Sequence, residues 1–317
     1  MSPLRLALPA ACLLAFLATA CGGDDTSAAT SKGSSTQTGA GGSGGSGSGG
    51  AGGSVAAEPD AAFVPKATGP CPELTAGTIT VAPDGKPRDV QIWISDAAKT
   101  KDGPLVFYWH GTGSSPVLEP PYGLGAEEIA QIEAEGGIVA APYHDPAAGS
   151  YPWFLTGGNG KEDDLRVADE VLACAIEKVG VDMRRIHSIG MSAGGLNTVQ
   201  MSWRRSGYLA SVVVYSGGEL TNPEPQDPTN LFPAMIFHGG PTDHVVIDFQ
   251  PISEKYRDRL RDLGHFAFIC DHGQGHSIPH DAVGSVHQFF VDHPFGTAPD
   301  PYTGALPAGF PTYCTLD

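Results

Sequence analysis

One ten-residue stretch, from Ile186 to Gly195, constrains this chain more than any other. It reads Ile-His-Ser-Ile-Gly-Met-Ser-Ala-Gly-Gly and leads into a helix-forming run that starts at Leu196. A short apolar strand that turns through a serine into a helix raises the serine hydroxyl above the edge of a sheet, on a strained backbone. Glycines flank the serine because its neighbours pack closely against that backbone. The stretch therefore predicts a nucleophile elbow with Ser192 at its tip.

The same spacing of glycine and serine also occurs from Gly41 to Gly45. That second copy lies in a tract of glycine and serine, which supports neither the strand nor the helix that the corner needs. Context therefore singles out Ser192.

The N-terminus predicts a secretory signal over residues 1–20. Residues 4–20 are apolar after a single positive charge at Arg5, but they are too short for a comfortable membrane span and contain Pro9. The segment ends Leu-Ala-Thr-Ala-Cys, which resembles the lipobox of bacterial lipoproteins and makes Cys21 the predicted lipidation site. The leucine stands one position earlier than in most lipoboxes, and cleavage of the same bond by ordinary signal peptidase is the alternative.

Cysteine parity favours lipidation. Removal of the signal leaves five cysteines, and lipidation of Cys21 leaves an even four, which can form two disulfides in an oxidising compartment. Four cysteines permit three pairings, and sequence alone does not decide among them. Cys174 points away from the apolar stripe of its predicted helix, so we expect its partner on a surface-running terminal segment. We therefore favour the pairs Cys71–Cys174 and Cys270–Cys314.

Residues 21–66 predict a lipidated cysteine followed by a flexible tether, because they are mostly glycine, serine, threonine and alanine. The remaining residues, 67–317, are enough for one α/β catalytic domain. The net charge of −17 argues against nucleic acid as a partner, since its binding requires clustered lysine and arginine. We expect the acidity to serve solubility, and contact with a membrane only through the lipid anchor.

Strand and helix signals alternate from Gly77 onward. Residues 105–109 are continuously apolar, as expected of a central strand that is buried on both faces. About eight strands are predicted, with helices mostly between them, which indicates a largely parallel sheet with helices on both faces. This order of elements is that of the α/β-hydrolase fold. The strands are expected at 78–81, 90–94, 105–109, 138–141, before Ser192, and at 212–214, 235–237 and 266–269; the helices near 126–134, 164–179, after Ser192, and near 254–263 and 282–291.

A serine hydroxyl is a poor nucleophile until a base takes its proton and a third group fixes that base. In this fold an acid and then a histidine follow the serine, each in a loop after a late strand. Asp243 follows the predicted strand at 235–237, and His276 lies in a glycine-containing loop after the strand at 266–269. We predict Ser192 as the nucleophile, His276 as the base and Asp243 as the acid, with Asp248 as the alternative acid.

Four blocks together resemble secreted esterases of the polyhydroxybutyrate-depolymerase-like and feruloyl-esterase-like α/β-hydrolases: His110–Gly113, Gly190–Gly195, His238–Val246 and Gly275–Pro279. The resemblance covers most of the domain and implies the same triad. It also implies that the backbone N–H groups of Thr112 and Ala193 hold the oxyanion. The chain departs from the family in two places: the His238-to-Asp243 spacing is one residue longer, and Thr112 stands where the family often has cysteine or another small residue.

Two further groups of residues have alternative explanations. Tyr151 and Trp153, in a long aromatic loop, either line a substrate pocket or pack the loop. His272, His276 and His280 have the four-residue spacing of a zinc-binding helix, but the glycines and proline between them break any helix, so we expect no metal site.

The sequence therefore predicts a lipid-anchored or secreted serine esterase that requires no cofactor. Candidate substrates are hydroxyalkanoate polyesters or oligomers, feruloyl or acetyl esters, and small esters. The alternatives are a serine peptidase of the same fold and a tethered protein that binds a ligand without turning it over.

Overall fold

A computed structural model of the 317-residue chain describes residues 63–156 and 158–316. The predicted signal peptide, the lipidation site at Cys21 and most of the predicted tether lie outside these residues. The same is true of the second glycine–serine pattern, from Gly41 to Gly45.

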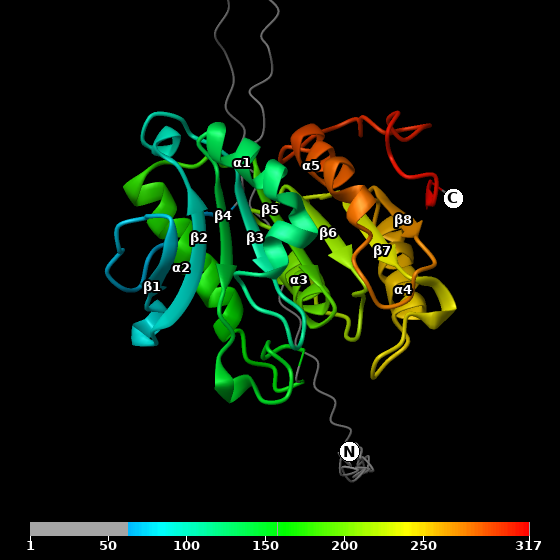
Figure 1. The fold of residues 1–317 in the computed structure, drawn as a ribbon, viewed down its shortest axis with the longest axis horizontal. Helices are drawn as coiled ribbons and strands as arrows, with labels where there is room; N and C mark the ends of the chain where they lie inside the picture. The colour runs from blue at the N-terminus through cyan, green and yellow to red at the C-terminus, as the bar shows by residue number, and fades with distance from the viewer. Residues whose placement is uncertain (1–62, 157, 317) are drawn as a thin grey trace, which may run out of the picture. The chain divides into compact units, whose positions relative to one another are not determined.

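A nine-stranded sheet runs through the described part of the chain in the order β1-β2-β4-β3-β5-β6-β7-β8-β9 (Figure 1). The strands from β4 to β8 in this order pair in parallel, whereas β1, β2 and β9 pair with their neighbours in antiparallel fashion. The strands are β1 (Gly77–Val81), β2 (Arg88–Ile94), β3 (Leu105–Trp109), β4 (Ile138–Pro142), β5 (Ile186–Met191), β6 (Ser211–Tyr215), β7 (Ala234–His238), β8 (Ala267–Asp271) and β9 (Cys314–Thr315).

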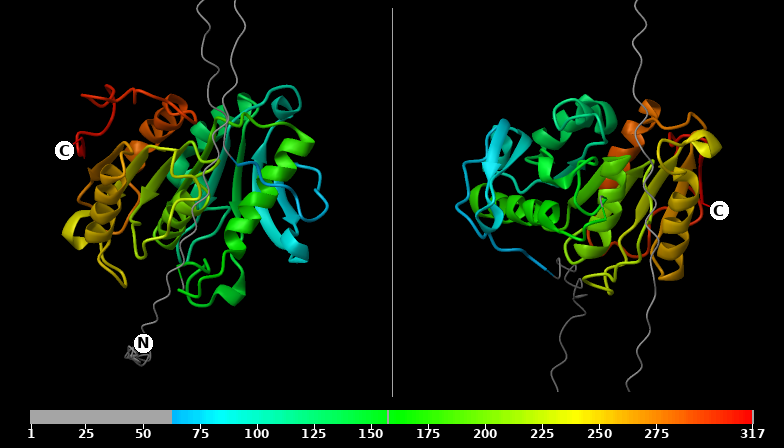
Figure 2. Two further views of the ribbon diagram at one scale, coloured as in Figure 1. Left: turned by 180° about the vertical axis from the view of Figure 1, so that it is seen from behind. Right: turned by 90° about the horizontal axis from the view of Figure 1, so that it is seen from below.

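Five α-helices in the described residues cover the two faces of this sheet (Figures 1 and 2). Alternate side chains of β3 separate two apolar cores, because successive residues of a strand point to opposite faces. Phe107 packs with α2, α3 and α4 on one face, and Tyr108 packs with α1 and α5 on the other. The helices are α1 (Ala126–Ala134), α2 (Asp163–Lys178), α3 (Ala193–Arg204), α4 (Phe249–Asp262) and α5 (Val283–Asp292).

The predicted architecture is confirmed, and two elements differ from the prediction. The ninth strand, β9, has only two residues and lies at the edge of the sheet beside β8, so no alternating pattern marks it in the sequence. Helix α4 begins at Phe249, five residues before the predicted start near Glu254. Pro251 lies in its first turn, where the missing backbone N–H costs no intrahelical hydrogen bond, so the proline does not delay the helix.

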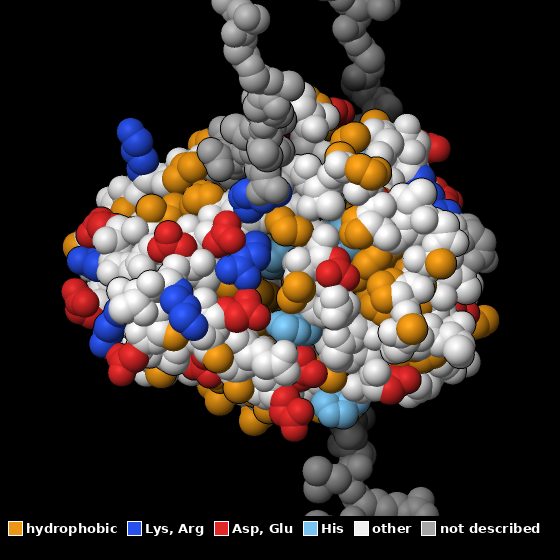
Figure 3. All heavy atoms as spheres, turned by 90° about the horizontal axis from the view of Figure 1, so that it is seen from above, with side chains coloured by type: hydrophobic (Ala, Val, Ile, Leu, Met, Phe, Trp, Pro, Cys, Tyr) orange, Lys and Arg blue, Asp and Glu red, His pale blue; other side chains and the backbone are white. Residues whose placement is uncertain are grey.

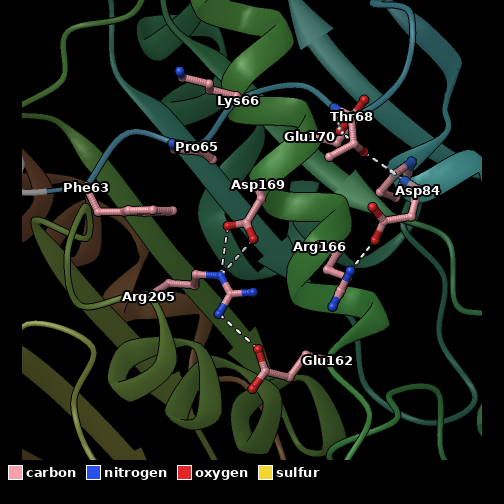
Figure 4. A pocket seen from close by; sticks show the side chains of 11 residues that line it. Phe63, Pro65, Lys66, Thr68, Asp84, Glu162, Arg166, Asp169, Glu170 and Arg205 are labelled. Carbon is pink, nitrogen blue, oxygen red and sulfur yellow. Dashed lines mark hydrogen bonds and ion pairs between the residues drawn. The ribbon is translucent and has the colours of Figure 1, made fainter.

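The N-terminal segment, residues 63–76, precedes the first strand and is bound to α2. Phe63 donates its backbone N–H to the Gly207 carbonyl at 2.9 Å, so contacts of the folded domain start before the predicted boundary at residue 67. The backbone N–H groups of Thr68 and Gly69 both donate to the Glu170 carboxylate at 2.8 Å (Figure 4). Segment and helix are therefore joined over several residues.

Two disulfides match the predicted pairing. Cys71–Cys174 joins the N-terminal segment to α2 across 103 residues of sequence. Cys270–Cys314 joins β8 to β9 across 44 residues, at directly opposite positions of the antiparallel pair. Segments near both ends of the described residues are thus covalently held, the N-terminal one to α2 and the C-terminal one to β8.

Charged side chains are mixed on the face shown in Figure 3, where lysine and arginine lie next to aspartate and glutamate instead of forming one basic patch. None of the helices among the described residues is both long enough and apolar enough to cross a bilayer.

Candidate active site

Ser192 occupies the sharp corner between β5 and α3. Its backbone has φ 57° and ψ −120°, a left-handed conformation that a residue with a side chain adopts at a cost. The corner is held by the Ser192 N–H, which donates to the Tyr215 carbonyl of β6 at 2.9 Å. A Cβ atom on Gly194 would overlap the Trp109 carbonyl oxygen, which explains why the helix must begin with small residues. Ser192 is therefore at the tip of a strained strand–turn–helix elbow, as its sequence predicts.

A chain of two hydrogen bonds joins Ser192, His276 and Asp243. The His276 Nε2 atom lies 2.9 Å from the Ser192 Oγ atom, and its Nδ1 atom lies 2.7 Å from Asp243 Oδ1. The three residues come from the loops after β5, β8 and β7, which end at the same edge of the sheet because these strands are parallel. This is the geometry of a serine nucleophile with its general base and orienting acid.

The Asp243 carboxylate is buried and held by two further donors. Its Oδ2 atom accepts a hydrogen bond from the Ser216 hydroxyl at 2.8 Å and from the Gly239 N–H at 2.9 Å. Burial alone would raise the pKa of Asp243, but the hydrogen bonds from His276, Gly239 and Ser216 together outweigh it, and the pKa lies below its usual value. Asp243 is therefore held as an anion that faces the imidazole.

Ser216 escaped the sequence analysis. It follows β6 directly, and its φ of 40° is in the left-handed region, which is uncommon for a residue other than glycine. The available signal is its position, since it is a polar residue at the carboxyl end of an apolar parallel strand. That end of the sheet is where functional side chains collect.

Asp248, the alternative acid, lies elsewhere. Its side chain is 72 % exposed and accepts from His244 Nδ1 at 2.7 Å, so it does not contact His276. The extra residue between His238 and Asp243 is accommodated by a short 3₁₀ turn, Gly240–Thr242, which returns the chain to the site.

Phe249 is a second residue that the sequence analysis did not identify. Its ring stacks on the His276 imidazole, with ring centroids 4.6 Å apart and an interplanar angle of 29°. Phe249 is the first residue of α4 and is almost fully buried. The ring thus limits the orientations open to His276 on the side facing α4.

The two predicted oxyanion donors flank the serine. Thr112 lies in the loop after β3, and Ala193 is the first residue of α3, where a backbone N–H has no partner within the helix. Neither N–H donates a hydrogen bond to another of the residues that the structure describes. Both amides are thus available to a negatively charged oxygen bound at Ser192.

A largely apolar cavity of about 450 Å³ opens at the triad. Tyr151 contributes to its wall, in agreement with the pocket prediction. Apolar side chains from α3 and from the loops after β6 and β7 form much of the remainder. The lining residues are Thr112, Tyr151, Thr156, Ser192, Ala193, Leu196, Leu220, Val245, Val246, Ile247, Phe249 and His276.

Trp153 does not line this cavity, which rules out the substrate-binding role that was one of its two predicted explanations. Its side chain is 0 % exposed and packs edge-on against Trp109 of β3, with ring centroids 5.0 Å apart. Its indole N–H donates to the His110 carbonyl at 2.9 Å. Trp153 therefore packs the aromatic loop onto the sheet, which is the structural explanation that the sequence left open.

The three histidines with four-residue spacing do not converge. His280 stacks on Tyr122, and His272 accepts a hydrogen bond from the Gln274 N–H, whereas His276 belongs to the triad. Within residues 63–156 and 158–316, no group of three or more histidine, cysteine, aspartate or glutamate side chains is arranged to hold a metal ion.

A second cavity, of about 270 Å³, lies between the N-terminal segment and helices α2 and α3 (Figure 4). Several of its charged side chains pair with one another: Arg205 donates to Asp169 and Glu162, and Arg166 pairs with Asp84. None of the described residues that line this cavity is a serine or a histidine, so the candidate active site is the cavity at Ser192.

No known protein family and no curated protein matches the sequence. Among solved structures, native pOPH aligns with a TM-score of 0.63 at 18% identity, over 78% of this chain and 96% of that chain. Native sOPH aligns with a TM-score of 0.61 at 17% identity, over 78% and 96%. A thermostable esterase aligns with a TM-score of 0.55 at 16% identity, over 68% of this chain and 62% of that chain. These similarities show that the chain has the α/β-hydrolase fold.

Proposed function

We propose that this α/β-hydrolase-fold protein is a serine esterase that cleaves carboxylic esters through an acyl-enzyme. The observation that carries the proposal is the hydrogen-bonded chain from Ser192 through His276 to Asp243, which opens into an apolar cavity. The esterase among the similar solved structures adds support at the level of the fold.

In the proposed reaction, His276 Nε2 accepts the hydroxyl proton as the Ser192 oxygen attacks the ester carbonyl carbon. The carbonyl oxygen becomes an oxyanion, which the N–H groups of Thr112 and Ala193 stabilise. His276 then gives the proton to the leaving alkoxide, and the acyl group stays on Ser192. In the second half of the reaction, water attacks the acyl-enzyme carbonyl with His276 again as the base, and the acid is released from Ser192. Asp243 stabilises the imidazolium that forms in each half of the reaction.

The cavity favours an uncharged, apolar acyl group. Among the described residues no lysine or arginine lines it, so a free carboxylate on the acyl chain would find no cation from them there. Leu196, Leu220 and Ile247 offer aliphatic surface, and each methylene buried against such surface contributes about 0.8 kcal/mol. Within the candidate substrates, we therefore propose aliphatic acyl esters, hydroxyalkanoate oligomers included, ahead of acetyl esters.

We also propose that the protein works in an oxidising compartment outside the cytoplasm, held by a lipid on Cys21 or secreted freely. Two disulfides support this location, since such bonds persist in oxidising environments. Metabolic labelling with a radioactive fatty acid, compared between the natural chain and Cys21→Ser, tests the anchor. Equal labelling of the two chains would rule it out.

Hydrolysis of p-nitrophenyl acetate, butyrate and octanoate by the natural chain and by Ser192→Ala tests the activity. We expect the variant to lose a factor of about 10⁴ or more in kcat, and the longer acyl esters to have the higher kcat/KM. Equal rates in both chains would refute the serine mechanism. Cleavage of peptide p-nitroanilides without ester cleavage would assign a peptidase. Inert protein that still binds esters would indicate a binding protein.

A further inference from the structure

Glu119 is a buried carboxylate beside the candidate oxyanion loop. Glu119 is 8 % exposed, and burial raises the pKa of its carboxyl above the usual value although Gly111, Ser114, Tyr108 and His276 all act to lower it. Buried glutamates are almost always paired with a cation. Glu119 forms no ion pair with another of the described residues. A carboxylate kept in this costly position calls for an explanation other than charge pairing.

The carboxylate holds one backbone amide with both of its oxygens. The Gly111 N–H donates to Glu119 Oε1 at 3.0 Å and to Oε2 at 3.1 Å. The Gly111 carbonyl is also engaged, because it accepts from the Ser114 N–H at 3.2 Å and lies 2.9 Å from His110 Nδ1. Both polar groups of Gly111 are therefore fixed by neighbours.

Fixing Gly111 sets the direction of the next amide. The Gly111 carbonyl and the Thr112 N–H belong to one planar trans peptide, so they point in opposite directions. Because the carbonyl is directed at Ser114 and His110, the Thr112 N–H is directed away from them. That N–H is the predicted oxyanion donor and belongs to a residue that lines the cavity at Ser192.

The turn that returns Glu119 to Gly111 is itself closed by hydrogen bonds. The Glu119 N–H donates to the Ser115 carbonyl, and the Leu118 N–H donates to the Ser115 hydroxyl, both at 3.2 Å. Gly111 is in turn packed on the nucleophile, since a Cβ atom built on it would lie 3.3 Å from Ser192 Cβ and 3.5 Å from Glu119 Oε2. A movement of Glu119 is thus transmitted through Gly111 to the site.

We propose that Glu119 is a positioning residue, which clamps Gly111 so that the Thr112 N–H stays directed at the oxyanion. This inference rests on the proposed esterase function. Glu119 acts through Gly111 and does not touch the substrate, so its removal is expected to weaken binding of the transition state and leave ground-state binding unchanged.

The test compares Glu119→Gln and Glu119→Asp with the natural chain and with Glu127→Gln, a control at an exposed glutamate of α1. Kinetics on p-nitrophenyl butyrate give kcat and KM. Inhibition by butylboronic acid, which forms a tetrahedral adduct with an active serine, reports on the oxyanion site without turnover. Inhibition by butyrate reports on ground-state binding. Thermal unfolding monitors the fold.

For both Glu119 variants we expect kcat to fall about 10- to 100-fold with KM within twofold, because a misdirected donor loses part of the 10²- to 10³-fold that one oxyanion donor contributes. Inhibition by butylboronic acid should weaken by the same factor, whereas inhibition by butyrate should not change. Glu127→Gln should match the natural chain in every measurement. A folded Glu119 variant with unchanged kcat overturns the inference. Failure of both variants to fold also overturns it, because Glu119 is then a requirement of the fold. If the natural chain itself lacks esterase activity, the proposed function is refuted. That result is measured on the natural chain alone and does not depend on the Glu119 variants.

Discussion

Replacing Gly239 by alanine tests how tightly the acid and histidine loops depend on each other. Gly275, the residue directly before His276, donates its N–H to the Gly239 carbonyl at 3.0 Å. A Cβ atom on Gly239 would lie 2.5 Å from the Gly275 carbonyl carbon and 2.6 Å from its nitrogen. The backbone of Gly239 has φ −97°, which alanine adopts freely, so the substitution acts through this collision alone.

The size of the displacement follows from these distances. Ordinary contact begins at 3.4 Å, and the Gly275 carbonyl oxygen would lie nearer still to the added Cβ, so the two backbones must separate by at least about 0.9 Å. A displacement of this size along the hydrogen bond between His276 and Ser192 increases the distance from Nε2 to Oγ from 2.9 Å to about 3.8 Å. That distance is beyond hydrogen-bond range. A misplacement of about 1 Å costs on the order of 10²-fold in rate, and we expect that loss in kcat on p-nitrophenyl butyrate.

Gly284→Ala is the matched control. Gly284 lies on the exposed side of α5, and the nearest atom to an added Cβ is 3.9 Å away. This variant should keep its kcat and gain up to about 1 kcal/mol in stability, because alanine favours a helix. A Gly239→Ala protein that keeps its kcat within threefold and its melting temperature would refute the argument that the two loops are locked together.

Three further predictions concern stability, the acid and pH. Removing the Cys71–Cys174 disulfide with paired serine substitutions should lower the free energy of unfolding by about 4–5 kcal/mol in urea titrations, because the bond closes a loop of 103 residues; a loss below about 1 kcal/mol would contradict this. Asp243→Asn should reduce kcat by about 10⁴-fold, and Asp248→Asn should leave it within threefold; the reverse ranking would move the acid role to Asp248. Burial raises the pKa of Glu119, so the native state holds this proton more tightly than the unfolded chain, and the free energy of unfolding should fall as pH rises from the usual glutamate pKa toward the raised one. Urea unfolding between about pH 4 and pH 7 should show a smaller fall in Glu119→Gln, and equal slopes in the two proteins would contradict the raised pKa.

The sequence sufficed for elements whose signal is local or follows from parallel pairing. Continuous apolar runs marked the central strands, and the glycines around Ser192 marked the elbow. Asp243 and His276 were predicted as the partners of Ser192 because they follow it in that order, each in a loop after a late strand. In the structure these strands are parallel, so their carboxyl ends share one edge of the sheet. Their proximity in the structure depends on this topology more than on any nearby residue.

The sequence did not suffice where a role depends on contacts between distant segments. Glu119 and Ser216 contact the site only after the sheet is assembled, and neither belongs to a recognisable motif. For Trp153 composition could not distinguish a pocket wall from loop packing, because an aromatic ring suits both. The two-residue strand β9 depends on its neighbour β8 and carries no periodicity of its own.

The attachment of the N-terminal segment to α2 determines how the protein would bear mechanical load. A pull on the chain ahead of Phe63 first breaks the hydrogen bonds of Phe63 and Thr68, and then meets the covalent bond between Cys71 and Cys174. The disulfide then offers the tension a covalent path into α2 ahead of β1, which begins at Gly77. An edge strand peeled from its end gives way one hydrogen bond at a time. The disulfide therefore shields the sheet from unravelling under traction.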